Sequence, residues 1–103
     1  MAEKSLFLQL MGELPLFKMI DFLIENKGMD FSKQAIAEGA GISRASLFNY
    51  WGVLERYQIV QITRKFGKTK LYTLNGKSKV AKKLLELEKI LIAEALNVKE
   101  LVH

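Results

Sequence analysis

Residues 32–57 read SKQAIAEGAGISRASLFNYWGVLERY and contain the signals for two short helices joined by a tight turn. Ser32 and Ser43 each stand where a side-chain oxygen caps the first turn of a helix. Gly39 and Gly41 mark the end of the first helix and the turn after it. The second helix repeats apolar residues at i, i+4 and i+7, which predicts one buried face. That face carries Leu47, Trp51 and Leu54.

The opposite face of this second helix presents short or fork-shaped polar side chains in its first turns. They are Arg44, Ser46 and Asn49. Two helices joined by a small-residue turn, with polar groups on the N-terminal half of the second, are typical of the helix-turn-helix that enters the major groove of DNA. We therefore predict that residues 43–56 form a recognition helix for double-stranded DNA.

The rest of the chain predicts a mainly α fold with one small β-hairpin, of the α+β class. We expect helices at about 3–12 and 15–26, the two helices above, strands at 58–65 and 70–74, and a final helix from about residue 77. In the hairpin we expect Val60 to pair with Leu74 and Ile62 with Tyr72. This register puts four apolar side chains on one face and favours an odd number of residues in the loop. We place the tip of the hairpin at residues 66–68.

This order of elements, together with several short motifs, resembles the winged helix-turn-helix transcriptional regulators of bacteria and archaea. The likeness is greatest to the small dimeric regulators of the MarR and ArsR kind. It is carried by Ala37 and Gly41 in the turn, the Gly41-Ile42-Ser43 run, Arg44 to Phe48, Leu54-Glu55-Arg56 before Ile59-Val60, and Leu71 to Asn75. It covers about residues 15–80, and Gln58 stands where these proteins usually have a glycine.

The resemblance implies three parts of the chain. A winged helix-turn-helix core at residues 15–76 would bind DNA, and its hairpin, residues 58–74, would be the wing that lies on the backbone or in the minor groove. The N-terminal helix, residues 1–14, and the C-terminal helix, residues 77–103, would form a dimer interface.

The distribution of charge also favours a nucleic-acid partner. The net charge is +5, and between Arg56 and Leu85 the chain has nine basic residues and no acidic one. Faces that are merely solvated usually mix both signs, whereas a cluster of one sign suits a row of phosphates. In the wing, the residues expected to contact DNA are Arg64, Lys65, Lys68 and Lys70.

On the recognition helix, Arg44 is the best candidate for reading a base. Its guanidinium can bind guanine O6 and N7 together, and a phosphate contact is the alternative. Ser46 and Asn49 can meet either a base edge or a phosphate. Ser43 belongs to the same surface, although its capping role explains it without DNA.

The aromatic residues of the recognition helix allow two interpretations. An exposed Phe48 or Tyr50 would pack on a thymine methyl group or on a sugar. Aromatic residues at helical spacing are more often part of a core, and we place Trp51 there.

The terminal helices predict a second interaction surface. Half of the residues are hydrophobic, and the apolar faces of these helices exceed what one small core can cover. A symmetric homodimer would cover them, and the alternative is that both helices fold back on their own domain. The dimer residues we expect are Leu6, Leu10, Leu84, Leu87 and Leu91.

Other classes of protein are disfavoured. The chain has no cysteine, and its one histidine is His103, so thiolate or histidine metal sites and nucleophile–base pairs are missing. We expect no enzymatic activity, no metal and no cofactor. The apolar stretch from Leu6 to Ile24 is interrupted by charged residues, and no signal peptide is evident, which predicts a cytoplasmic, nucleoid-associated protein without a membrane partner.

Two functions from different classes remain open at this point. The first is a sequence-specific DNA-binding transcriptional regulator. The second is a winged-helix module for protein–protein assembly, or an architectural DNA-binding protein without sequence preference, because fold alone does not decide function. Nothing in the sequence indicates a small-molecule effector, which would have to bind at the dimer interface.

Overall fold

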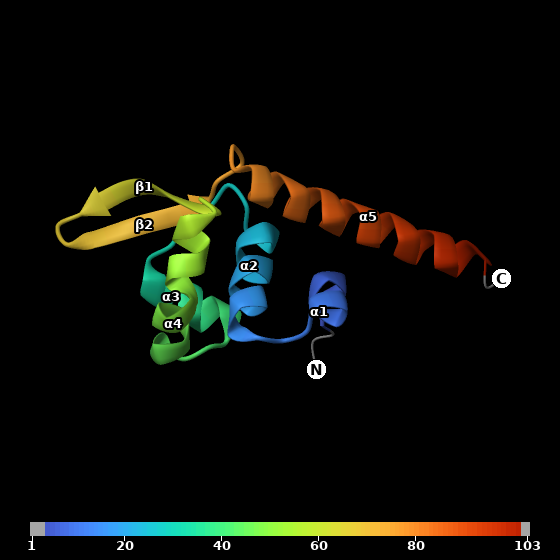
Figure 1. Cartoon of the computed structure of the whole chain (residues 1–103), viewed down its shortest axis with the longest axis horizontal. Helices are drawn as coiled ribbons and strands as arrows, with labels where there is room; N and C mark the ends of the chain where they lie inside the picture. The colour runs from blue at the N-terminus through green and yellow to red at the C-terminus, as the bar shows by residue number, and fades with distance from the viewer. Residues whose placement is uncertain (1–3, 102–103) are drawn as a thin grey trace.

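The computed structural model describes residues 4–101, and the side chains of residues 4–97, so His103 lies outside the described residues. The elements are α1 (Leu6–Met11), α2 (Pro15–Glu25), α3 (Lys33–Ala40), α4 (Arg44–Arg56), β1 (Val60–Phe66), β2 (Thr69–Leu74) and α5 (Lys79–Leu101), as Figure 1 shows. The predicted order of elements and the α+β class are confirmed. Among residues 4–101, no helix combines the length and the apolar content needed to cross a bilayer.

The two predicted serine caps begin α3 and α4. The Oγ of Ser32 accepts a hydrogen bond from the backbone N–H of Ala35 at 3.1 Å, and the Oγ of Ser43 accepts one from Ser46 at 3.0 Å. Each bond satisfies a donor that the first turn of a helix leaves without an intrahelical partner. The cap at Ser43 therefore fixes where the recognition helix begins.

Both helices end in the same way, with one residue in the left-handed conformation. After α3 this residue is Gly41, with φ +71°, and the N–H of Ile42 donates to the carbonyl of Ala37 at 3.0 Å. After α4 it is Gln58, with φ +53°, and the N–H of Ile59 donates to the carbonyl of Leu54 at 2.8 Å. These are the six-to-one bonds of a Schellman motif, which normally uses glycine at the left-handed position.

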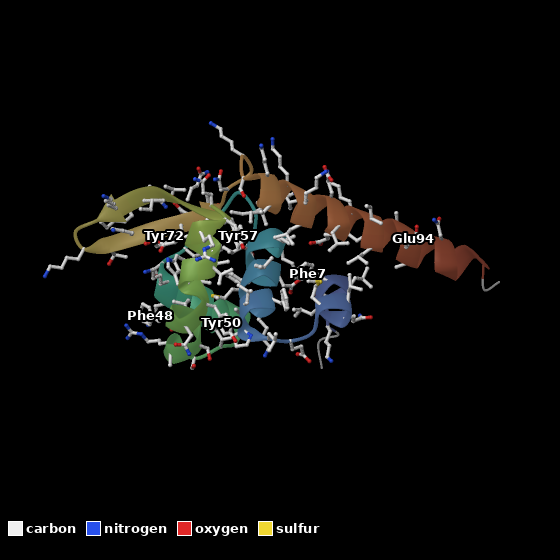
Figure 2. The ribbon with its side chains drawn as sticks, in the orientation of Figure 1. Phe7, Phe48, Tyr50, Tyr57, Tyr72 and Glu94 are labelled. Atoms are coloured by element: carbon white, nitrogen blue, oxygen red, sulfur yellow. The ribbon has the colours of Figure 1, made fainter. Side chains whose placement is uncertain are left out.

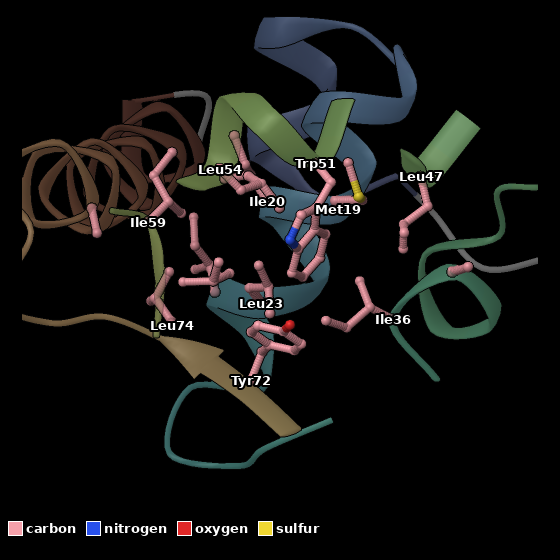
Figure 3. Close-up of a cluster of buried hydrophobic side chains, with 14 of the residues drawn as sticks. Met19, Ile20, Leu23, Ile36, Leu47, Trp51, Leu54, Ile59, Tyr72 and Leu74 are labelled. Carbon is pink, nitrogen blue, oxygen red and sulfur yellow. The ribbon is translucent and has the colours of Figure 1, made fainter. Parts of the chain in front are cut away.

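The core lies where α2, α3 and α4 meet the base of the hairpin (Figure 3). The rings of Trp51 on α4 and Tyr72 on β2 meet edge to face, with centroids 4.8 Å apart. Gly39 lets α3 approach α2, since a β-carbon there would lie 2.2 Å from the ring of Phe22. The largest fully buried side chains are Phe7, Met19, Leu23, Ile36, Leu47, Leu54 and Ile59.

The hairpin has the predicted register at its base and a different one toward its tip. Val60 pairs with Leu74 and Ile62 with Tyr72, as expected. Beyond them a bulge between Ile62 and Arg64 shifts the register, so that Phe66 pairs with Thr69. The bulge, and not the loop, accommodates the one additional residue of β1. The prediction of an odd-numbered loop at 66–68 was therefore wrong. Bulges increase the local twist of a strand, which turns the outer part of the hairpin relative to its base.

A short bridge that the sequence did not reveal holds the inner edge of the hairpin. The N–H of Phe31 donates to the carbonyl of Tyr72, and the N–H of Tyr72 donates to the carbonyl of Phe31, both at 2.8 Å. Phe31 precedes α3 by two residues. The bridge therefore joins β2 to the start of the helix-turn-helix.

Helix α5 leaves the core and projects away from it (Figure 1). Its first turn is anchored by Ala81, which is fully buried, and Leu84 and Leu87 pack against the same core. The molecule measures 56 × 30 × 20 Å. Its radius of gyration is 14.7 Å, larger than the ~13 Å of a compact domain of this length.

One acidic residue interrupts the apolar face of α5. Glu88 lies one turn from Leu84 and Leu85, and with Ile24 and Glu25 of α2 it lines a cavity of about 460 Å³. Its Oε2 atom is buried and has no hydrogen-bond partner among the described residues. Burial raises the pKa of Glu88, and the charges of Asp21 and Glu25 raise it further. The ionised carboxylate therefore opposes the packing of α5 on α2.

Replacement of Gln58 by glycine should stabilise the protein. A side chain in the left-handed region costs about 1–2 kcal/mol, and part of that gain is lost because glycine is more flexible in the unfolded chain. We expect Gln58→Gly to raise the free energy of unfolding by roughly 0.5–1 kcal/mol in urea denaturation. Gln58→Ala, which keeps the β-carbon, is the control and should not reproduce the gain. A less stable glycine variant would contradict the strain at this position.

Replacement of Glu88 by glutamine should stabilise the protein at neutral pH. A raised pKa in the folded state means that stability is lost as the pH rises from the ordinary glutamate value through the raised one. At pH 7 we expect Glu88→Gln to raise the melting temperature above that of the wild type, because the neutral amide does not carry the charge that burial disfavours. The difference from wild type should shrink as the pH falls to about 4, near the unperturbed pKa.

Glu94→Gln is the matched control for this experiment, since Glu94 is exposed on the projecting part of α5 (Figure 2). Its melting temperature should follow that of the wild type at both pH values. A Glu88→Gln variant that melts below wild type at pH 7 would show that the carboxylate stabilises the fold.

Candidate nucleic-acid interface

Helix α4 buries one face and exposes the other, as its spacing predicted. Leu47, Trp51 and Leu54 are buried, while Arg44 and Asn49 are exposed. The exposed face also contains two small residues, Ala45 and Gly52, and a β-carbon at Gly52 would meet no atom within 4 Å. A helix with small residues on its outer face can approach a flat or concave partner closely.

The two serines near the start of α4 are engaged with each other. Besides capping the N–H of Ser46, the Oγ of Ser43 donates to the Oγ of Ser46 at 3.1 Å. Ser43 is exposed and Ser46 half-buried. Their first role is therefore to define the N-terminus of α4, and their contact with DNA stays a prediction.

The structure separates the two aromatic residues that the sequence left open. Tyr50 is half-buried and packs against the core, whereas Phe48 is 54% exposed. Figure 2 shows Phe48 on the outer side of α4. The guanidinium carbon of Arg44 lies 6.0 Å from the centre of the Phe48 ring, and Nζ of Lys33 lies 5.6 Å from it. Phe48 is therefore part of the exposed surface, between two cations.

A hollow of about 480 Å³, which we call the basic groove, lies between the start of α3, α4 and the hairpin. It contains four positive side chains and no acidic one. It is lined by Ser32, Lys33, Gln34, Arg44, Phe48, Lys68, Thr69, Lys70 and Tyr72. The groove thus brings Arg44 of α4 together with Lys68 and Lys70 of the hairpin. The sequence analysis assigned all three residues to DNA binding, although they belong to separate elements.

Lys33 is the member of the basic groove that the sequence analysis missed. Its Nζ lies 4.9 Å from the centre of the Trp51 ring and 5.8 Å from that of Tyr72. These ring faces attract the ammonium group and hold it at the groove. The sequence did contain a signal for Lys33. A cation in the first turn of a helix is repelled by the positive end of the helix dipole, so a lysine at this position indicates another role.

Arg64 differs from the other basic residues of the hairpin because it is paired. Its Nε and Nη2 atoms donate to the two carboxylate oxygens of Asp30, each at 3.0 Å. The hydroxyl of Thr63, at the bulge, donates to the same carboxylate. The guanidinium of Arg64, followed by this hydroxyl, lowers the pKa of Asp30 below its ordinary value. Arg64 therefore ties the hairpin to the loop before α3, and its charge is already compensated.

Two other basic residues of the hairpin face each other. Lys65 pairs with Lys70 across the two strands, and both are exposed. Like charges directly opposite in an antiparallel pair destabilise it. An anion bound between or beside them removes this penalty. The hairpin therefore carries a local charge conflict that an anionic partner would relieve.

The basic run of the sequence is divided between two places in the fold. Lys68 and Lys70 of the hairpin line the basic groove, whereas Arg56, Lys77 and Lys79 line a separate hollow of about 310 Å³. That hollow lies where the end of α4 meets the start of α5. An extended anion such as a DNA backbone can reach several charged groups at once, which suits a divided surface better than a single small anion.

The predicted dimer residues fall into different environments. Leu10 is 57% exposed, and Leu6 and Leu91 are half-buried. Leu84 and Leu87 pack against the core of their own chain. Among the side chains of α5 up to residue 97, the most exposed apolar ones are instead Ile90, Ile92 and Leu96. The exposed apolar surface thus lies farther along α5 than the sequence predicted.

No arrangement for metal binding is present in the described part of the chain. Among residues 4–101, no three His, Cys, Asp or Glu side chains come together as a group that could hold a metal ion.

Comparisons with solved structures identify the fold. NadR, solved in complex with 4-hydroxyphenylacetate, is similar over 95% of this chain and 73% of its own, with a TM-score of 0.63 and 20% identity. ZitR from Lactococcus lactis is similar over 90% and 73%, with a TM-score of 0.63 and 17% identity. A possible transcriptional regulator from Methanosarcina mazei is similar over 82% and 72%, with a TM-score of 0.55 and 9% identity.

These likenesses confirm the winged helix-turn-helix fold that the sequence suggested. From here on the hairpin β1–β2 is called the wing. At such low identities the likeness concerns the fold and not the activity. No protein-family model matches the sequence, and no curated protein matches it significantly.

Proposed function

We propose that this protein is a DNA-binding transcriptional regulator, with α4 in the major groove and the wing on the backbone or in the minor groove. The observation that carries the proposal is the basic groove, which places Lys33, Arg44, Lys68 and Lys70 between the recognition helix and the wing without a carboxylate among them. A winged helix-turn-helix with this distribution of charge is suited to a DNA duplex.

Three features of the surface support DNA over a protein partner. The exposed face of α4 is slim at Ala45 and Gly52, which lets a helix enter a groove. The Lys65–Lys70 pair is relieved by an anion. The second basic hollow, near Lys77, extends the contact along a duplex. A protein-assembly surface would instead be expected to have a larger apolar centre than the single exposed ring of Phe48, with charges only at its rim.

The proposed regulator acts as a symmetric homodimer. The apolar residues of the projecting part of α5, together with Leu10 and Leu14 near α1, are exposed and would be covered by a second copy. Two copies related by a two-fold axis would present two recognition helices to two half-sites of a palindrome. Such a protein would work on the nucleoid, in the cytoplasm.

The experiment that tests the proposal has two steps. Sequences bound from random duplex DNA are first selected at near-physiological salt, and the affinity for the selected duplex is then measured over a range of salt concentrations. If about six phosphates are neutralised per dimer, the log–log slope should be near −5. An enriched palindrome supports a regulator, and binding without sequence preference supports an architectural protein. A flat salt response, or no binding, would favour an assembly module instead.

The wing lysines and the Arg64 ion pair should respond differently in this assay. Lys68→Ala should reduce the magnitude of the salt slope by about 0.9 per subunit on the DNA, because one phosphate contact is lost. The double variant Asp30→Asn with Arg64→Gln removes the ion pair without changing the net charge. Its slope should stay that of the wild type. An equal loss of slope in both variants would show that Arg64 leaves Asp30 to bind a phosphate.

The dimer is tested at the exposed end of α5, where substitution does not disturb the core. Ile92 is 45% exposed and Leu96 56% exposed. Aspartate at either position would place a charge in the proposed interface, so light scattering at micromolar concentration should give 11.7 kDa instead of twice that mass. Glu94→Lys changes the charge on the other side of α5, about 160° around the helix from both residues, and should remain dimeric. A wild-type protein with the mass of one chain would refute the dimer.

A further inference from the structure

Phe48 is the feature of α4 that neither the fold nor the proposed phosphate contacts explain. It is an aromatic residue that is 54% exposed, on a helix whose other large apolar side chains face the core. Phenylalanine is also a weaker helix former than alanine or leucine, so local structure does not favour it at an exposed position. An exposed ring in the middle of a basic surface therefore points to a role in binding.

The surroundings of Phe48 leave its ring open on the side away from the core. Ala45 lies three residues before it and Gly52 four residues after it, so its two neighbours along the exposed face are the smallest available. Arg44, one turn before, lies against the ring at 6.0 Å. A base edge that approaches α4 between these small residues would meet the Phe48 ring and the Arg44 guanidinium side by side.

The chemistry of the major groove then selects the contact. The base edges there present hydrogen-bond donors and acceptors and a single apolar group, the 5-methyl group of thymine. A phenyl ring has no polar atom with which to read the donors and acceptors. It gains free energy only by removing an apolar group from water, whereas Lys33 and Arg44, which lie beside the ring, are the groups able to bind phosphates.

We propose that Phe48 is a specificity-determining residue that recognises thymine in the major groove by burying its 5-methyl group, next to the base or phosphate bound by Arg44. The inference rests on the proposed function, since it requires α4 to lie in the major groove. It adds a class of base contact that the polar residues of the helix do not supply. It also implies that 5-methylcytosine, which carries a methyl group at the same place, is accepted in part at the same position.

The test removes one methyl group at a time from DNA. In the selected duplex each thymine is replaced by deoxyuridine, which pairs in the same way and lacks only the 5-methyl group. For the wild type, one position in each half-site should lose about fourfold in affinity, the equivalent of roughly 0.8 kcal/mol for one buried methyl group. The Phe48→Ala variant should bind every deoxyuridine duplex with the same affinity that this variant has for the parent duplex.

A second arm restores the methyl group on another base. At the sensitive position, thymine is replaced by cytosine and then by 5-methylcytosine. The wild type should regain about fourfold with 5-methylcytosine, and Phe48→Ala should regain nothing. Met29→Ala is the control, because Met29 is a large exposed apolar residue that lines neither the basic groove nor the second basic hollow. It should keep the response of the wild type.

The outcomes are distinguishable from those of the proposed function. If the wild type binds DNA and no deoxyuridine substitution weakens it, or if Phe48→Ala keeps the sensitive position, the role of Phe48 is overturned while the regulator stands. If Phe48→Ala is weaker than the wild type by the same factor on every duplex, with or without the methyl group, the ring packs on sugar or backbone and its role in reading thymine is also overturned. If the wild type binds no DNA, both proposals fail. Thermal melting of Phe48→Ala verifies that the variant is folded.

Discussion

The geometry of the binding surface depends on Tyr72. Its ring meets Trp51 of α4 edge to face, and its backbone pairs with Phe31, two residues before α3. One buried residue of the wing is therefore fixed both to the recognition helix and to the helix that precedes it. Since Lys70 lies on the same strand and Lys68 in the turn just before it, their distance from Arg44 across the basic groove is set by this contact. Trp51 serves two purposes here, because its ring also faces the ammonium group of Lys33.

Several residues of the proposed interface conflict with the ordinary rules of stability. A lysine stands in the first turn of α3, two lysines face each other in the wing, and an aromatic ring is exposed on α4. Each is unfavourable in the free protein, and each is improved by an anionic partner with apolar groups in its groove. Conflicts of this kind are expected where a surface is shaped for binding and not for folding. Their position around one groove supports DNA more strongly than the net charge does.

The sequence was sufficient for those features that depend on local pattern. The serine caps, the order of elements and the register at the base of the wing follow from periodicity and from short-range hydrogen bonding. The bulge at Thr63 and the pairing of Arg64 did not follow, because they depend on Asp30, more than thirty residues earlier in the chain. The run of basic residues between Arg56 and Leu85 therefore suggested more unpaired positive charges than the structure has.

The same limit applies to the faces of the helices. Periodicity located the apolar face of α5, but it did not show which part of that face the core covers. The exposed part begins only after the helix has left the core. Similarly, Phe48 and Tyr50 both flank the buried stripe of α4, and only the packing of the neighbouring helices decides that Tyr50 turns inward. The contacts with DNA that the sequence suggests remain predictions for all the residues concerned.

The start of α5 connects the proposed DNA surface to the proposed dimer. The hydroxyl of Ser78 donates to the carbonyl of Tyr57 at the end of α4, at 2.8 Å, and its oxygen accepts from the N–H of Ala81 at the start of α5. Ser78 is buried, so this link is shielded from water. If two copies join through the outer part of α5, the separation of their recognition helices is set by the angle at which α5 leaves α4. The spacing of the two half-sites then follows from this junction, and Glu88, which weakens the packing of α5 on α2, lies where that angle is most easily changed.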